Sequence, residues 1–296
     1  MKLLKFNSKN FSLSFGLGFI IFLSLTWLIL QFTAPKIPLL GFHGIIDAET
    51  PASQAVPAEM EYPKQELERF LEYLVSHNYW FLTTQELYDY FLTSSKEIPT
   101  EHLNQKPIMI SFDDGYKTVY TSLMPMLEKL EQKYGQKVKV VLFVNPGTLA
   151  TPKSIASTHL GCQELREGFK KGFYDIQSHG LNHKKLTELN PQDLIVELLQ
   201  AQTQLRSCTN GLDPEQKVAS HLAYPYGAYN KQVEAYSSRY YLSSYLYNSR
   251  VLKHCWLKNY YEIPRLTVNR RKPASLLIKM AQRSHQIKKK KNAKDC

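Results

Sequence analysis

Two neighbouring carboxylates are the first residues in the chain that suggest chemistry. The segment ISFDDGYKTVY, residues 110–120, places Asp113 and Asp114 between an apolar run and a glycine. Adjacent negative charges repel each other, so stability alone gives no reason to place them together. The structural alternative is an ordinary surface turn in which Gly115 supplies a positive φ. A chemical role for the pair requires partners elsewhere in the sequence.

Two histidines offer such partners. His179 and His183 are four residues apart in SHGLNH, a spacing that puts both side chains on one face of a helix or tight turn. Together with one carboxylate they would form a metal site with positions left for water and substrate. Such an ion acidifies bound water and polarises a carbonyl oxygen. We therefore expect one aspartate to bind a metal ion and its neighbour to act as a general base.

The elements around these residues predict an α/β fold. Apolar segments of strand length cover residues 37–43, 107–112, 138–144, 173–179, 218–225, 239–247 and 262–268. Helical patterns cover residues 64–78, 83–92, 119–134, 190–207 and 274–283, with Thr84 and Asn190 at N-cap positions. Continuously apolar strands that alternate with helices indicate a parallel sheet. The expected architecture is a closed or nearly closed (β/α) barrel of about seven strands, and the alternative is an open doubly wound sheet.

Polar side chains fall within or just after the predicted strands. Those that could share a site with the paired carboxylates are His43, His179, Tyr226 and Arg265. Sites on parallel sheets form at the C-terminal ends of the strands, and most of these residues lie at such ends. We expect the fold to bring them together around the two aspartates.

The N-terminal region predicts a membrane anchor. Three lysines precede residues 13–32, a run of twenty residues without a charge. Such a helix is about 30 Å long, enough to cross a bilayer. The preceding lysines favour a cytoplasmic N-terminus and an exported catalytic domain. A cleaved signal peptide is the alternative, although the run ends in QFTAPK rather than in small residues typical of a cleavage site.

The charge distribution separates the two ends from the body of the chain. The net charge is +11, and the first ten residues and the tail from Arg283 to Cys296 carry most of it. No nucleic-acid motif accompanies the basic residues, so we expect no contact with DNA or RNA. We divide the chain into a basic N-terminus with anchor (1–36), a catalytic domain (37–282) and a basic tail (283–296). The tail is either a solvated end or a contact with anionic lipid or acidic glycan.

The four cysteines contain no C-x-x-C pair, which argues against a cysteine-based zinc ribbon. An exported domain permits a disulfide. The sequence leaves two pairings open, Cys162–Cys208 and Cys208–Cys255.

SFDDG and SHGLNH together resemble the first two motifs of the polysaccharide deacetylases, the carbohydrate esterase family 4 with its NodB-like domain. The resemblance implies a NodB-like barrel in which Asp113 is the catalytic base. It also implies that Asp114, His179 and His183 bind a divalent metal ion, with zinc favoured over cobalt, nickel or iron.

AYPYGAYN, residues 223–230, resembles the third family motif, which implies that the Tyr226 N–H holds the oxyanion. Three departures weaken the resemblance. Gly180 replaces the usual Ser or Thr after the first ligand, so we expect a loop-bracing hydrogen bond to be lost. Tyr224 stands where many members carry an arginine. No late histidine follows a leucine-rich segment, and this histidine is the family's general acid.

The segment LLGFHGI, residues 39–45, suggests where the acid lies instead. It resembles the first strand of the circularly permuted biofilm poly-N-acetylglucosamine deacetylases, which implies that His43 is the general acid. IPRLTV resembles their late arginine-bearing strand, which implies that Arg265 orients Asp113. The resemblance covers about residues 37–282.

The activity implied is metal-dependent removal of N-acetyl groups from an N-acetylglucosamine-containing polysaccharide outside the cytoplasmic membrane. Its partners would be that polysaccharide, the membrane through the N-terminal helix, and exopolysaccharide synthesis or export machinery. Two alternatives stay open. One is an anchored glycan-binding relative without turnover, and the other is an O-acetyl esterase or peptidoglycan amide hydrolase on the same fold.

Overall fold

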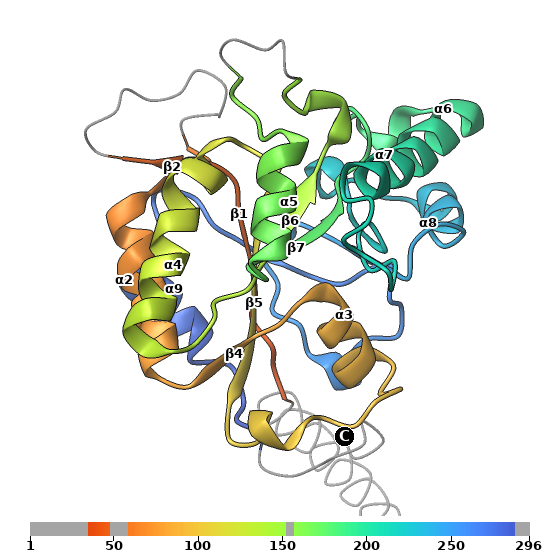
Figure 1. The fold of residues 1–296 in the computed structure, drawn as a ribbon. Coiled ribbons are helices and arrows are strands. Elements are labelled where there is room, and N and C mark those ends of the chain that lie inside the picture. The colour runs from red at the N-terminus through yellow and green to blue at the C-terminus, as the bar shows by residue number, and fades with distance from the viewer. Residues whose placement is uncertain (1–34, 48–58, 152–156, 288–296) are drawn as a thin grey trace, which may run out of the picture. The chain divides into compact units, whose positions relative to one another are not determined.

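The computed structural model describes residues 35–47, 59–151 and 157–287 (Figure 1). The predicted anchor at residues 13–32 and most of the predicted tail lie outside these ranges, so both stay predictions. None of the helices within the described ranges is both long enough and apolar enough to span a bilayer.

The central element is a parallel sheet. Its strands run in the order β10 (Leu266–Thr267), β1 (Leu39–Phe42), β5 (Lys106–Asp113), β6 (Val140–Val144), β7 (Tyr174–Ser178), β8 (His221–Ala223) and β9 (Ser243–Tyr245). Each neighbouring pair is parallel. Each of the seven predicted strand segments overlaps one of these strands. A further strand, β4 (Tyr79–Phe81), pairs with β5 and was not predicted, because only residues 79–82 separate the helical patterns 64–78 and 83–92.

The edges of this sheet meet at a narrow seam. Tyr245 of β9 forms a single parallel bridge with Ile263, which lies three residues before β10. The Leu246 N–H donates to the Ile263 carbonyl at 2.8 Å. One bridge in place of a full ladder makes the sheet a curved half-barrel whose edges touch. This agrees with the expected nearly closed barrel and not with an open doubly wound sheet.

Both faces of the sheet are buried, as the apolar strands predicted. Leu40, Ile110 and Leu142 belong to the larger core cluster, which includes residues of the outer helices. The residues that alternate with them, Met109 and Val141 among others, belong to a second cluster. The outer layer is built mainly from α2 (Lys64–Ser76), α4 (Met124–Tyr134), α5 (Cys162–Lys170), α7 (Ala201–Cys208) and α9 (Ala274–Ala281), and α4 and α9 both pack against α2 (Figure 1).

Four of the five predicted helical segments contain an α-helix of five or more residues, and the fifth contains a shorter one. The segment 83–92 is a short α-helix, α3 (Thr84–Leu87), continued by a π-helical turn. The prediction of Thr84 as N-cap was wrong by one residue. Thr83 caps the helix through a capping box with Glu86, whereas the Thr84 hydroxyl donates to Asp175 at 2.7 Å.

Asn190 is the N-cap of α6 (Pro191–Ile195), as predicted, and its side chain accepts from the Asp193 N–H at 2.9 Å. Two helices were missed, α5 and α8 (Lys231–Ser237), because each buries only one large apolar side chain, Leu165 in α5 and Val233 in α8. A disulfide joins Cys162 at the start of α5 to Cys208 at the end of α7, with 5.3 Å between the Cα atoms. The structure thus selects one of the two pairings that the sequence left open.

Candidate metal centre and active site

The predicted site residues gather at the C-terminal ends of the strands. Six of the seven line one cavity of about 500 Å³: His43, Asp113, Asp114, His179, His183 and Tyr226. The seventh, Arg265, is fully buried and contacts Asp113. The fold therefore brings together all seven residues that the sequence singled out.

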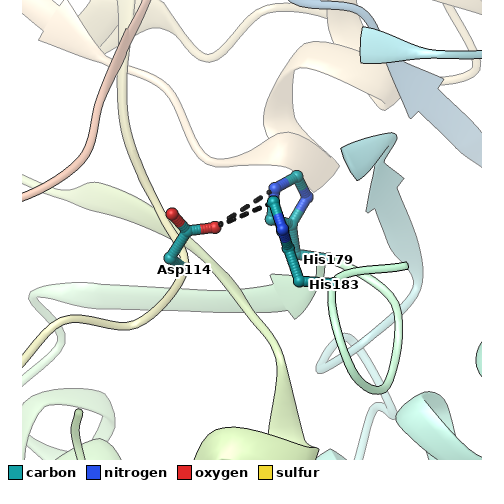
Figure 2. A group of neighbouring side chains, drawn as sticks. All are labelled: Asp114, His179 and His183. Carbon is teal, nitrogen blue, oxygen red and sulfur yellow. Dashed lines mark ion pairs between the residues drawn. The ribbon is translucent and has the colours of Figure 1, made fainter. Parts of the chain in front are cut away.

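Three of these side chains form a cluster that fits a metal ion. The Asp114 Oδ1 atom lies 3.5 Å from His179 Nε2 and 3.3 Å from His183 Nε2 (Figure 2). One ligand atom from each residue lies within 4.8 Å of the others. Within the described part of the chain, no hydrogen bond reaches this carboxylate oxygen, although it is buried. A buried oxygen that faces two imidazole nitrogens and has no hydrogen-bond donor has the surroundings that a cation bound between them would satisfy.

The orientation of His179 leaves its Nε2 atom available as a ligand. Its Nδ1 atom lies 2.8 Å from the Ala223 carbonyl oxygen. Because a carbonyl only accepts hydrogen bonds, Nδ1 must carry the proton and Nε2 must present its lone pair. Burial lowers the pKa of His179 to about 3, and burial also lowers the pKa of His183. Both imidazoles are neutral at physiological pH, which is the form that binds metals.

Two of the three residues in this cluster have left-handed backbone conformations. Asp114 has φ 69° and His183 has φ 55°. Such conformations are uncommon for residues other than glycine and occur often at functional sites. The turn directly after β5 points Asp113 and Asp114 in different directions, which allows the two carboxylates to serve different purposes.

Asp113 and Arg265 form a two-pronged ion pair. Arg265 Nη1 donates to Asp113 Oδ1 at 2.6 Å, and Nη2 donates to Oδ2 at 2.8 Å. Burial of Asp113, only 2% exposed, would by itself raise the pKa of its carboxyl. The charge and hydrogen bonds of Arg265 outweigh burial and hold this pKa at about 2. Asp113 is consequently ionised throughout the physiological range.

Arg265 is itself held from two further sides. Its Nε atom donates to the Leu246 carbonyl at 3.0 Å, and its Nη1 atom donates to the Ser111 hydroxyl at 3.0 Å. These contacts fix the guanidinium plane and, through it, the orientation of the Asp113 carboxylate. The contact inferred from IPRLTV is present, and it supplies an arginine beside the base although Tyr224 occupies the position where many family members carry one.

His43 follows β1 directly, and the sheet register places it beside the aspartates. Phe42 of β1 pairs with Phe112 of β5, so the next residues, His43 and Asp113, leave neighbouring strands at the same level. The His43 ring packs edge-on against Tyr247 with 5.4 Å between centroids. Its Nδ1 atom is buried and has no hydrogen-bond partner among the residues described. The His43 side chain therefore lines the cavity, and no other described residue of the site forms a hydrogen bond with its Nδ1 atom.

The loop between the two histidine ligands is braced by a residue that the sequence analysis missed. Glu197 is 1% exposed, and its Oε2 atom accepts from the N–H groups of Leu181 and Asn182, both at 2.9 Å. Its Oε1 atom accepts from the Asn182 side chain at 3.1 Å. Gly180 has no side chain that could brace this loop, and the buried Glu197 carboxylate provides hydrogen bonds to it instead.

A sequence signal for Glu197 exists in retrospect. Buried residues of this helical segment include Leu194, Leu198 and Ala201, and Glu197 falls on the same face by its spacing. A charged residue on an otherwise apolar helix face must meet buried donors. Asn145, at the end of β6, adds a second brace by donating from its side chain to the Gly180 carbonyl at 3.1 Å.

Tyr226 lies at the mouth of the cavity. Its backbone is left-handed, with φ 60°, and its side chain is 66% exposed. Its ring centroid lies 4.5 Å from that of His183. Aromatic rings also line the cavity at Tyr116, which stacks on His159, and at Tyr247.

Comparison with known proteins agrees with this geometry. Residues 100–243 match the family model described as polysaccharide deacetylase. A Bacillus subtilis protein named as a polysaccharide deacetylase, YxkH, is 27% identical over 197 residues, which are 67% of this chain and 59% of that protein. The poly-β-1,6-N-acetyl-D-glucosamine N-deacetylase of Staphylococcus aureus is 25% identical over 175 residues, which are 56% of this chain and 54% of the enzyme. The match thus spans less than two thirds of either relative.

Solved structures show the same fold. The Streptococcus pyogenes deacetylase PplD, solved in complex with acetate, has a TM-score of 0.68 at 21% identity, over 84% of this chain and 99% of that one. IcaB from Ammonifex degensii has a TM-score of 0.63 at 18% identity, over 84% and 97%. The family match includes the paired aspartates and both histidines, and it sits on a half-barrel that gathers them. Residues 100–243 of this chain thus match the polysaccharide deacetylase family.

Proposed function

We propose that this chain hydrolyses N-acetyl groups of an N-acetylglucosamine-containing polysaccharide with a divalent metal ion and releases acetate. The observation that carries the proposal is the Asp114, His179 and His183 cluster beside an ionised Asp113. The named activity of the Staphylococcus aureus relative supports the substrate class.

The ligand set suits several metals. One carboxylate oxygen and two imidazole nitrogens fit zinc, cobalt, nickel or iron, with zinc favoured for hydrolysis. When bound, the ion would polarise the acetamide carbonyl and acidify a water molecule. The low pKa of Asp113 keeps its carboxylate in the ionised form, which is the form that can accept a proton.

The remaining residues divide the proton transfers between them. Asp113 accepts the proton of the water whose oxygen attacks the acetamide carbon, while Arg265 keeps the carboxylate in a fixed orientation. The Tyr226 N–H stabilises the oxyanion. As the carbon–nitrogen bond breaks, His43 in its protonated form donates to the leaving nitrogen. Acetate and a free amine are the products.

The place of action is part of the proposal. A helix formed by residues 13–32 would hold the catalytic domain on the outer side of the cytoplasmic membrane. The Cys162–Cys208 disulfide supports an exported domain, because disulfides persist mainly outside the reducing cytoplasm. Protease digestion of intact cells tests this location, since an outward domain is cleaved and a cytoplasmic one is protected.

Acetate release from a panel of defined oligomers tests the activity. We expect release from N-acetylglucosamine oligomers, and comparison of β-1,6- and β-1,4-linked members would identify the glycan. Release from O-acetyl substrates alone would establish an esterase instead. Glycan binding without release by metal-loaded protein would establish a binding protein and overturn the proposal.

A further inference from the structure

A second hollow adjoins the catalytic cavity, and the proposed reaction does not use it. It has a volume of about 740 Å³, and its lining includes Gly227, Tyr229, Arg250, Trp256 and Arg283. We call it the arginine groove. Its residues come from the loop after β8, from the segment between β9 and β10, and from Arg283, which follows α9.

The groove is continuous with the catalytic cavity. Gly227 lines both hollows. Two consecutive residues just after β9 also line different hollows: Leu246 lines the groove and Tyr247 lines the cavity. Gly227 has φ 64°, and a Cβ atom there would lie 3.0 Å from the Tyr247 nitrogen. Only backbone atoms therefore separate the groove from the cavity at this point. A linear glycan with one unit in the cavity can therefore place a neighbouring unit in the groove.

The groove carries an excess of positive charge. Arg250 and Arg283 are exposed, and neither forms an ion pair within residues 35–47, 59–151 and 157–287. Glu262 also lines the groove, but its carboxylate lies 3.5 Å from Lys231 Nζ and accepts from the Asn259 side chain at 3.1 Å. The groove as a whole is cationic.

Aromatic side chains give the groove a surface suited to sugars. Tyr229 and Trp256 are 36% and 40% exposed. The Tyr229 ring is stacked on Tyr224 with 5.8 Å between centroids, which holds its plane fixed. Rings of this kind combine an apolar face with a polar edge, as a pyranose does.

We propose that the arginine groove holds the sugar next to the one being deacetylated and selects a neighbour that still carries its N-acetyl group. The inference rests on the proposed function. Removal of an acetyl group leaves a primary amine, which is protonated at neutral pH. An ammonium group in the groove meets two arginines and is repelled, whereas an uncharged acetamide is not. The chain would accordingly act poorly beside its own product and leave a polymer with spaced free amines.

Binding of the product tests the inference without need of catalysis. The probe is a fully deacetylated glucosamine oligomer, titrated into the metal-loaded full chain. We expect the double variant R250Q/R283Q to bind it at least about fivefold more tightly than the wild type, with a difference that shrinks at high salt. The matched control R239Q/K279Q loses two exposed charges outside the groove and should bind like the wild type. Equal affinity in wild type and R250Q/R283Q would overturn the inference.

Measurement of turnover provides a second test of the inference. The two oligomers in each comparison share one reacting N-acetyl unit and differ only in whether one neighbouring sugar is acetylated. One comparison varies the neighbour on one side of the reacting unit, and a second comparison varies the neighbour on the other side. We expect kcat/KM to favour the acetylated neighbour by about tenfold on one side, and R250Q/R283Q to lose this preference. A preference unchanged in that variant contradicts the inference. If no oligomer releases acetate, the proposed function fails, while the product titration still decides whether the groove repels amines.

Discussion

Asp113 and Arg265 lie buried together, and each depends on the other for its charge. Removal of one partner leaves the other charged and without compensation in the interior, which costs about 3–5 kcal/mol in comparable buried pairs. We expect Arg265→Gln to lower the free energy of unfolding by that amount and to abolish turnover. Urea titration measures the first effect and acetate release measures the second.

Arg69→Gln is the control for this variant, because Arg69 pairs with Glu66 at 2.7 Å on the surface. Exposed pairs contribute about 0–1 kcal/mol, so this change should be nearly neutral. An Arg265→Gln protein as stable as Arg69→Gln would show that the buried pair does not hold Asp113.

His43 should matter for turnover and not for metal binding. It lies outside the ligand cluster, and its proposed role is to protonate the leaving nitrogen. Loss of a general acid typically lowers kcat by about 10²–10⁴. We expect His43→Ala to show that loss while its metal content equals that of the wild type. Unchanged kcat in His43→Ala would mean that another group is the acid.

The Asp114 carboxyl should make metal affinity depend on pH. Burial, with a further contribution from the Asp113 charge, raises the pKa of Asp114 to about 6 in the metal-free protein. Protons and metal compete for this oxygen, so affinity should be constant above that pH and should fall by about tenfold for each pH unit below it. Burial lowers the pKa of both histidines, to about 3 for His179, so protonation of His179 adds to the loss only at lower pH. Competition with a chelating dye measures this, and affinity that stays flat from about pH 7 to pH 5 would contradict it.

At the scale of elements, the loop of residues 179–183 owes its shape to a neighbouring helical segment. Glu197 accepts three hydrogen bonds from this loop, and groups that hold metal ligands in place typically contribute about 10–100-fold to metal affinity. We expect Glu197→Ala to weaken metal binding by that factor, and Glu197→Gln to weaken it less because one acceptor oxygen remains. Glu188→Ala removes an exposed carboxylate nearby and should leave affinity unchanged. Equal affinities in Glu197→Ala and Glu188→Ala would show that the brace is not needed for binding.

Strands such as β1 and β6 were predictable because each lies in an apolar run, LLGF and VVLFV. β4 was not, since only residues 79–82 separate two helical patterns, and α5 and α8 each bury only one large apolar side chain. The cluster of Asp114, His179 and His183 was predictable from residue type and spacing. Glu197 was not, because its function comes from tertiary contact with a loop that precedes it in the sequence. Thr84 was misplaced by one residue because Thr83 and Thr84 both have a capping side chain, and only the contact with Asp175 distinguishes them.

At the scale of the whole molecule, the sheet order explains how residues from both ends of the domain share one site. β10 and β5 flank β1, so Arg265 from late in the chain and His43 from its beginning both reach the aspartates of β5. A general acid before the paired aspartates is therefore compatible with the half-barrel. The prediction of His43 and Arg265 depended on resemblance, since the contact of Arg265 with Asp113 and the register that places His43 beside Asp113 leave no mark in local sequence.

The central claim is that a metal ion held by Asp114, His179 and His183 is required to release acetate from an N-acetylated glycan. The most direct test measures acetate release from N-acetylglucosamine oligomers and bound metal per chain on the same samples of wild type and His179→Ala. We predict one metal ion per chain and acetate release for the wild type, and the loss of both in His179→Ala without rescue by added metal. Release that persists in metal-free His179→Ala, or a metal-loaded wild type that releases none from any oligomer, would contradict the claim.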